Sequence, residues 1–139
     1  MNAEPAIVRY MVSDVSKALA FYTGHLGFTV ESDYSPAFGS VQRGNLRLLL
    51  AGPQSSAGRP MSDGAVPGPG GWNRIHFIVP DLAAEVARLK SEGCEFRNEM
   101  ITGPGGSQIL LLDPSGNVIE LFQLAGQLPA NTARKLVQR

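Results

Sequence analysis

The residues best suited to chemistry in this sequence are an arginine and a histidine on one expected strand, and a glutamate on another. Arg74 and His76 lie in the strand-like run 74–80, and Glu120 lies in the run 118–124. Side chains two residues apart in a β-strand point to the same face. A histidine near a carboxylate can act as a general base or hold a metal ion, and an arginine can bind a carboxylate through its forked donors. These side chains are therefore the first candidates for a functional site.

The strand that carries Arg74 belongs to a pattern that occurs twice. A strand that starts near residue 7 ends at Asp14, and the strand that starts at residue 74 ends at Asp81. An aspartate at this point can cap a helix, and the apolar spacing predicts helices over 15–26 and 82–92. A glycine able to adopt positive φ follows each predicted helix. These glycines are Gly27 and Gly93.

The second part of each half also matches. A hairpin with a glycine and an asparagine in its turn follows each helix, and Gly44-Asn45 aligns with Gly116-Asn117. A repeat of this length predicts paired units that bury a common core. The sequence thus predicts an α+β fold of two tandem βαβββ modules. The strands of the hairpins are expected at 39–42 and 46–50, and at 108–112 and 118–124.

Both modules are expected to form one domain over the whole chain. The segment between them is rich in Gly, Pro and Ser, which is typical of a linker or lid without regular structure. The C-terminal tail is expected to form a short helix after Pro129 that packs on the domain or contacts a dimer partner. The expected boundaries are 5–51 for module one, 52–71 for the linker, 72–125 for module two and 126–139 for the tail.

Composition excludes several classes of protein. The chain has 139 residues, and 12 Lys and Arg balance 12 Asp and Glu, so the basic excess of a nucleic-acid binder is missing. There is no apolar run of about 18 residues that could span a membrane. The N-terminus has neither a basic start nor an apolar stretch, so a signal peptide is not expected. A single cysteine, Cys94, cannot form an internal disulfide, which favours a cytoplasmic location.

Two motifs within the repeat point to a known family. The first consists of Val-Ser-Asp-Val at 12–15, Ala-Phe-Tyr-Thr at 20–23 and Leu-Gly-Phe at 26–28. The second consists of Asp-Pro-Ser-Gly-Asn at 113–117 and Ile-Glu-Leu-Phe at 119–122. Together and in this order, they resemble the glyoxalase/bleomycin-resistance/dioxygenase superfamily, also called the vicinal oxygen chelate fold. The resemblance implies two βαβββ modules forming a barrel-like cleft, and commonly a homodimer.

The resemblance also implies four positions at which enzymes of the family hold a divalent metal. They fall on the first and last strands of each module, and here they are Ile7, Leu48, Arg74 and Glu120. Of these four residues, only Glu120 has an atom that can bind a metal ion. A catalytic site for Zn, Ni, Mn or Fe needs about three protein ligands. His76 lies about 6 to 7 Å further along its strand than Arg74, given about 3.3 Å per residue. We therefore expect no cofactor, with an incomplete metal site at Glu120 as the alternative.

The alternation of strand residues predicts which side chains line the cleft. It places Arg9 on the cleft face of the first strand, at the position equivalent to His76. Arg9 or Arg74 could pair with Glu120 and replace the metal as a clamp between strands, with little net stability. Alternatively, one arginine stays free and binds an anionic or carbonyl-bearing ligand. The apolar residues expected beside them are Leu48, Leu50 and Phe122.

Three further side chains have more than one possible role in the sequence. Trp72 precedes the first strand of the second module, where it could stack on a flat ligand or belong to a core or an interface. Arg97 or its neighbour Asn98 could face the cleft from a short polar-edged strand, and the sequence does not decide between them.

These observations favour a metal-free protein that binds a small molecule in the cleft, through Arg9, Arg74, Trp72, Leu48 and Phe122. The main alternative is a metal-dependent lyase, isomerase or dioxygenase with Glu120 as a ligand, acting on a small oxygenated substrate. Two other readings are a metal-free enzyme with His76 as general base beside Glu120, and a structural or regulatory dimer without a ligand.

Overall fold

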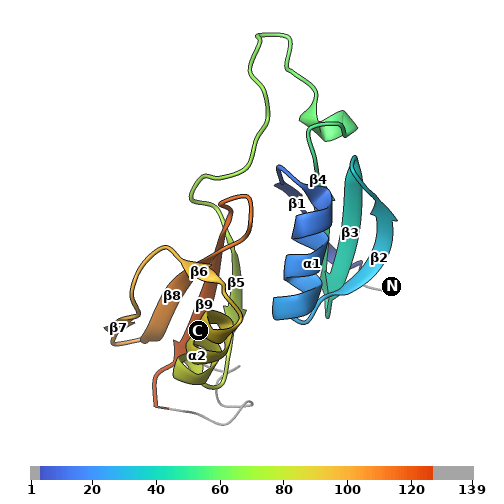
Figure 1. Cartoon of the computed structure of the whole chain (residues 1–139). Coiled ribbons are helices and arrows are strands. Elements are labelled where there is room, and N and C mark those ends of the chain that lie inside the picture. The colour runs from blue at the N-terminus through green and yellow to red at the C-terminus, as the bar shows by residue number, and fades with distance from the viewer. Residues whose placement is uncertain (1–3, 127–139) are drawn as a thin grey trace. The chain divides into compact units, whose positions relative to one another are not determined.

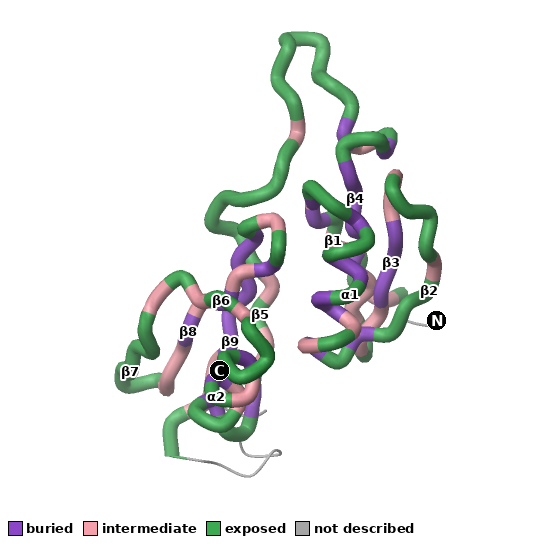
Figure 2. The backbone as a smooth tube through the Cα atoms, in the orientation of Figure 1, coloured by how far each residue is buried: buried purple, intermediate pink, exposed green. Residues whose placement is uncertain are grey.

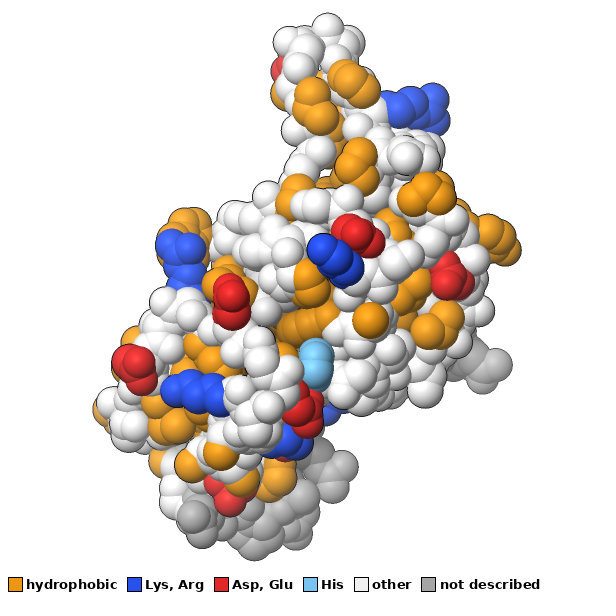
Figure 3. All heavy atoms as spheres, viewed as in Figure 1, with side chains coloured by type: hydrophobic (Ala, Val, Ile, Leu, Met, Phe, Trp, Pro, Cys, Tyr) orange, Lys and Arg blue, Asp and Glu red, His pale blue; other side chains and the backbone are white. Residues whose placement is uncertain are grey.

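The structure is a computed structural model that describes residues 4–126. Within this range the chain forms two compact units: residues 4–71 with 113–117, and residues 72–112 with 118–126. The helix expected after Pro129 lies outside the described residues. No helix in the described part is long and apolar enough to cross a membrane. On the face shown in Figure 3, acidic and basic side chains are interspersed.

The first unit contains one helix on a four-stranded sheet with the order β1-β4-β3-β2 (Figure 1). β1 runs parallel to β4, and the remaining pairs are antiparallel. This is the βαβββ arrangement that the sequence predicts. The elements are β1 (Ala6–Met11), α1 (Val15–His25), β2 (Thr29–Tyr34), β3 (Phe38–Arg43), β4 (Leu46–Ala51) and the short 3-10 helix η1 (Ser56–Gly58).

The second unit repeats this arrangement with one break. Its sheet has the order β5-β9-β8-β6, with β5 parallel to β9 and the other pairs antiparallel. Two short strands, β6 and β7, pair with successive parts of β8 in place of one continuous strand. The α+β prediction of two βαβββ modules is confirmed. The elements are β5 (Ile75–Ile78), α2 (Leu82–Ser91), β6 (Glu95–Phe96), β7 (Ile101–Gly103), β8 (Gly106–Leu112) and β9 (Val118–Leu124).

Both helices begin at the predicted residue and end one residue before the predicted end. The Asp14 carboxylate accepts a hydrogen bond of 3.0 Å from the Lys17 amide, and the Asp81 carboxylate accepts one of 3.1 Å from the Ala84 amide. These side chains satisfy amides that have no partner within the helix. Beyond each C-terminus the chain turns at a glycine with positive φ, and these glycines are Gly27 (φ 72°) and Gly93 (φ 85°).

Each sheet has one face that packs on the helix of its own unit, and we call the opposite face the open face. In the first unit α1 packs on β3 and β4, whose buried residues are visible in Figure 2. Gly39 marks the helix-side face of β3, because a Cβ there would lie 3.0 Å from Leu19 Cδ2. In the second unit the Leu82 amide, at the start of α2, donates to the Gln123 side chain, which marks the helix-side face of β9.

A buried polar network holds segment 113–117 in the first unit. The Tyr22 hydroxyl donates to Asp113 Oδ2 over 2.8 Å, and Asn117 Nδ2 donates to the Met11 carbonyl over 2.8 Å. The Ser13 amide donates to Ser115 Oγ over 2.9 Å. Burial, reinforced by the Asp113 carboxylate, raises the pKa of Tyr22 far above its ordinary value. These contacts give the Asp-Pro-Ser-Gly-Asn motif a role in stability.

Candidate functional site

Glu120 occupies the middle of the open face of the second sheet. It lies on β9 between two neighbours, Leu110 on β8 and His76 on β5. Residues paired across a sheet point to the same face, and Gln123 shows that odd-numbered positions of β9 face the helix. Glu120 therefore points to the open face, where it is only 7% exposed. A carboxylate this deeply buried needs partners that compensate its charge.

Arg74 supplies the main partner of this carboxylate. Its Nε donates to Glu120 Oε1 over 3.0 Å, and its Nη2 lies 3.0 Å from the same oxygen. Its Nη1 donates to the Trp72 carbonyl over 3.3 Å. The guanidinium thus has a hydrogen-bond partner on both sides, and its charge is paired with that of Glu120. Of the two arginines predicted as partners, Arg74 is the one that the structure places on Glu120.

His76 lies on the other side of the carboxylate. Its Nδ1 is 3.4 Å from Glu120 Oε2, and its ring is tilted against Phe122 with centroids 5.3 Å apart. The imidazole side chain is 45% exposed. When Nδ1 carries the proton toward Glu120, Nε2 is the nitrogen left for a ligand or for proton transfer. The predicted candidates Arg74, His76, Glu120 and Phe122 thus form one contiguous cluster, which we call the Glu120 cluster.

Trp72 and Arg97 form a stacked pair beside this cluster. The Arg97 guanidinium carbon lies 4.6 Å from the centroid of the Trp72 ring, at the distance of a cation–π contact. Trp72 is 63% exposed, so it is not a core residue of the described chain. The sequence left the direction of Arg97 undecided, because nothing in a short polar segment reveals a contact with a residue 25 positions earlier.

The open face of the first sheet carries different side chains. Ile7 and Arg9 lie on it, because the intervening Val8 and Tyr10 are on the more buried side of β1. Their partners on β4 are Arg47 and Leu49. Arg47 on β4 forms an ion pair of 2.6 Å with Glu31 on β2, across the intervening strand β3. Arg9 thus lies on the open face as predicted, but in a unit separate from the Glu120 cluster.

The prediction that Leu48 and Leu50 line the ligand cavity is wrong. Leu48 is completely buried, and Leu50 pairs with Gly39 on the helix-side face. The error comes from the hairpin turns. Residues 44 and 45 alone connect β3 to β4, whereas residues 113–117 connect β8 to β9. An alignment of Asn45 with Asn117 therefore puts β4 and β9 out of register by one residue. A shift of one residue reverses the face of a strand residue.

The register therefore makes Leu49, not Leu48, the counterpart of Glu120. Asp14 caps α1 seven residues after Ile7, and Asp81 caps α2 seven residues after Arg74. These equal spacings align the first strand of one unit with the first strand of the other. Arg9 then corresponds to His76, and their partners on the last strands are Leu49 and Glu120. The corrected fourth position still has no metal donor, because leucine has none.

The residues present do not fit the divalent metal that the fold family implies. At the family's positions stand Ile7, Leu49, Arg74 and Glu120, of which Glu120 alone can ligate. One of its oxygens already receives the Arg74 guanidinium. His76 adds a second donor, and no group of three or more His, Cys, Asp or Glu suited to a metal occurs among the described residues. A catalytic centre needs about three protein ligands.

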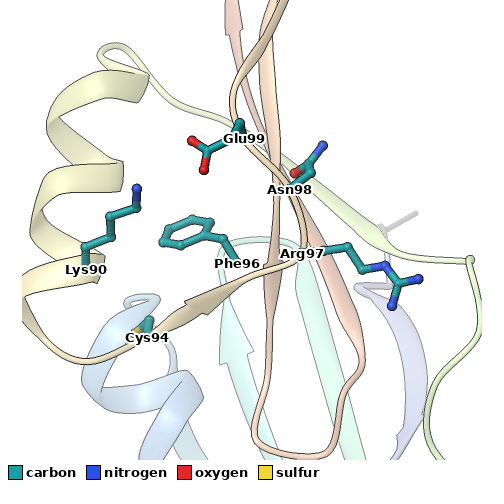
Figure 4. Close-up of a pocket in the computed structure, with 6 residues that line it drawn as sticks. All are labelled: Lys90, Cys94, Phe96, Arg97, Asn98 and Glu99. Carbon is teal, nitrogen blue, oxygen red and sulfur yellow. The ribbon is translucent and has the colours of Figure 1, made fainter.

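A separate hollow of about 490 Å³ lies between the end of α2 and β6 (Figure 4). Burial, with a contribution from Glu92, raises the pKa of the Cys94 thiol in its wall, which disfavours the reactive thiolate. The hollow is open, and half of its lining residues are uncharged, so it offers fewer converging charged groups than the Glu120 cluster. The lining residues are Lys90, Cys94, Phe96, Arg97, Asn98 and Glu99.

Solved structures with the same fold include both enzymes and binding proteins. A lactoylglutathione lyase from Agrobacterium tumefaciens is 20% identical, with a TM-score of 0.69 over 88% of this chain and 95% of that protein. An antibiotic binding protein from Streptomyces sp. is 24% identical, with a TM-score of 0.66 over 89% and 98%. At these identities the likeness establishes the fold alone.

Another similar structure is more informative about the family. A member of the glyoxalase/bleomycin resistance protein/dioxygenase superfamily from Sphaerobacter thermophilus is 27% identical, with a TM-score of 0.68 over 88% of this chain and 98% of that protein. Curated protein sequences gave no match. The family model for the Glyoxalase/Bleomycin resistance protein/Dioxygenase superfamily matches residues 6–121, which is most of the chain. This protein therefore belongs to the glyoxalase/bleomycin resistance protein/dioxygenase superfamily.

Proposed function

We propose that this protein binds a small molecule without a metal ion, on the open face of its second sheet. The observation that carries the proposal is the ion pair between Arg74 and Glu120 at 3.0 Å. It puts a permanent cation on the one carboxylate that stands at a metal-binding position of the family. The space around Glu120 thus favours an organic ligand over a divalent cation.

The cost of removing Arg74 from Glu120 supports this proposal. A metal ion bound to Glu120 would have to displace the guanidinium or tolerate its charge nearby. Breaking a buried ion pair costs about 3–5 kcal/mol, and the 30% exposure of Arg74 lowers that figure. With two donors at most, Glu120 and His76, a metal ion would recover little of this loss.

The side chains around the pair suit a small organic ligand. His76 and Trp72 are largely exposed, and Phe122 is half-buried beside His76. Apolar surface with a few fixed polar groups is the usual composition of a ligand site. Binding proteins occur within this fold, since one structural relative is an antibiotic binding protein. We extend the proposal to a homodimer, as the family resemblance implies, which sedimentation equilibrium would test.

Thermal denaturation with a panel of flat aromatic compounds tests the proposal. The panel includes acids, neutral amides and amines of the same ring system. A ligand that binds only the folded state raises the melting temperature, with a free energy of about 2.7 kcal/mol at a concentration 100 times Kd. We expect at least one class to raise it in the wild type and not in the double variant Arg74→Leu/Glu120→Leu. No shift with any compound would contradict a binding function.

The alternative is a metal-dependent lyase, isomerase or dioxygenase of the same superfamily. It is favoured by the 3.4 Å between His76 Nδ1 and Glu120 Oε2, which brings two metal donors together. This reading requires Arg74 to leave Glu120 when metal binds. It therefore predicts that removing the Arg74 guanidinium increases metal affinity, whereas our proposal predicts no stoichiometric metal in the wild type.

A further inference from the structure

The open face of the second sheet carries a charge that the Glu120 cluster does not balance. Arg74 is paired with Glu120, and three of its nitrogens are already engaged by Glu120 and the Trp72 carbonyl. Arg97 is different. Within the described part of the chain it forms no ion pair, and its guanidinium contacts the face of the Trp72 ring at 4.6 Å.

The register of the sheet places Arg97 on the open face. Its amide donates to the Leu110 carbonyl over 2.8 Å, which continues the pairing of Phe96 with Leu111. Leu110 pairs with Glu120, and Glu120 pairs with His76. Arg97, Leu110, Glu120 and His76 therefore form one row across the sheet, all pointing to the same side.

Side-chain directions agree with this placement. Figure 4 shows Phe96 and Lys90 on one side of the β6 segment and Arg97 extending to the other. The Lys90 ammonium lies 5.8 Å from the Phe96 ring centroid, so that side is the one covered by α2. Arg97 accordingly points away from the helix, toward the face that carries Glu120.

Stacking on Trp72 prepares Arg97 to bind an anion. The Arg97 guanidinium lies over the Trp72 ring, and within the described part of the chain its N–H groups form no hydrogen bond, so they remain available for a forked pair of hydrogen bonds to a carboxylate. Because the ring already restricts the side chain, less conformational entropy is lost when a ligand binds. Arg97 thus supplies a positioned, uncompensated positive charge.

We infer that the Arg97–Trp72 stack is the anion-recognition element of the ligand site, and that the site selects flat aromatic carboxylates. The inference rests on the proposed binding function and specifies its ligand class. The carboxylate pairs with Arg97, and the rings lie along the row over Leu110 toward His76 and Phe122. Strands are about 4.8 Å apart, so the row spans about 14 Å, which suits two linked rings.

The test compares biphenyl carboxylate, biphenyl carboxamide and biphenyl methylamine by titration calorimetry. In the wild type we expect the carboxylate to bind most tightly. Arg97→Gln should weaken its binding by about 10-fold to 100-fold, as for a lost charged hydrogen bond, and leave the amide unchanged. Arg97→Lys keeps the charge without the fork, so an intermediate loss is expected. Arg88→Gln removes an equal charge from α2 and should have no effect.

A second measurement locates the binding. Trp72 is the only tryptophan of the chain, so its indole N–H gives a single resonance in an NMR spectrum of the labelled protein. We expect the carboxylate to shift this resonance in the wild type and much less in Arg97→Gln, whose remaining spectrum would show that it is folded.

The outcomes separate this inference from the proposed function. If the wild type binds the amide or amine as tightly as the carboxylate, or if Arg97→Gln binds the carboxylate normally, the role of Arg97 is refuted while a binding function stands. If the wild type binds none of the compounds, both the inference and the binding function on which it rests are contradicted.

Discussion

The two open sheet faces of this duplicated chain carry different chemistry at equivalent positions. In the first unit the last strand presents Leu49, and in the second it presents Glu120. Arg9 stands where the second unit has His76, and Ile7 where it has Arg74. The open face of the second unit thus carries a buried carboxylate with partners around it. The equivalent position in the first unit carries an uncharged leucine, which needs no such partners. The difference is the reason that our proposal places the ligand site on the second copy.

The two ion pairs of these faces provide the largest contrast. Glu120 is nearly buried, so Arg74→Ala would leave its charge uncompensated and lower the free energy of unfolding by about 2–4 kcal/mol. Arg47→Ala removes the equivalent type of pair from Glu31, whose side chain is 25% exposed against 10% for Glu120, and should have a smaller effect. Urea denaturation at neutral pH measures both. Equal losses for the two variants would show that the pairs do not differ in burial as described.

The two hairpin turns should differ in a similar way. Asn117 donates to Met11 and Asp113 and accepts from the Gly70 amide, so Asn117→Ala should cost about 2 kcal/mol. Asn45, in the corresponding turn of the first unit, is exposed, and Asn45→Ala should be nearly neutral. Thermal and urea unfolding would measure the two variants together. A neutral Asn117→Ala would mean that the network around segment 113–117 does not contribute to stability.

Alkaline pH offers another test of that network. The pKa of Tyr22 is raised in the folded state by burial and by Asp113, so the stabilisation is complete below the ordinary tyrosine pKa of 10.0. The unfolded chain alone releases this proton above that value, so stability falls as the pH rises beyond it. Tyr22→Phe should show a shallower decline in alkaline urea titrations. An unchanged slope would show that Tyr22 is not the residue responsible.

Making the second face resemble the first is expected to change stability least. The double variant Arg74→Leu/Glu120→Leu places a leucine where the first unit has Leu49. Replacing a buried ion pair by apolar residues is often neutral or stabilising, so we expect a change within about 2 kcal/mol of the wild type. Ligand binding should nevertheless be lost. A double variant that stays folded and still binds the ligand would show that the Glu120 cluster is not part of the binding site.

Much of the fold could be predicted from local sequence. Asp14 and Asp81 cap helices through contacts with residues three positions away, and the strand alternation correctly put Arg74, His76 and Arg9 on open faces. Such features depend on short-range geometry. The pairing of Arg74 with Glu120 followed from the strand order of the family, as one of two alternatives.

The errors arose where turn length or distant contacts decide the outcome. Leu48 was placed on the wrong face, because turns of different length shift the strand register by one residue. The direction of Arg97 could not be predicted, since β6 is too short to show alternation and its contact, Trp72, lies far away in sequence.

The metal content of the chain tests the central claim most directly, namely that Arg74 has taken the place of a metal ion on Glu120. The purified protein would be stripped of metal, dialysed against Zn, Ni, Mn or Fe, and the bound metal per chain measured by elemental mass spectrometry. We expect no stoichiometric metal in the wild type or in Glu120→Ala. One metal ion per chain in the wild type, lost in Glu120→Ala, would contradict the account.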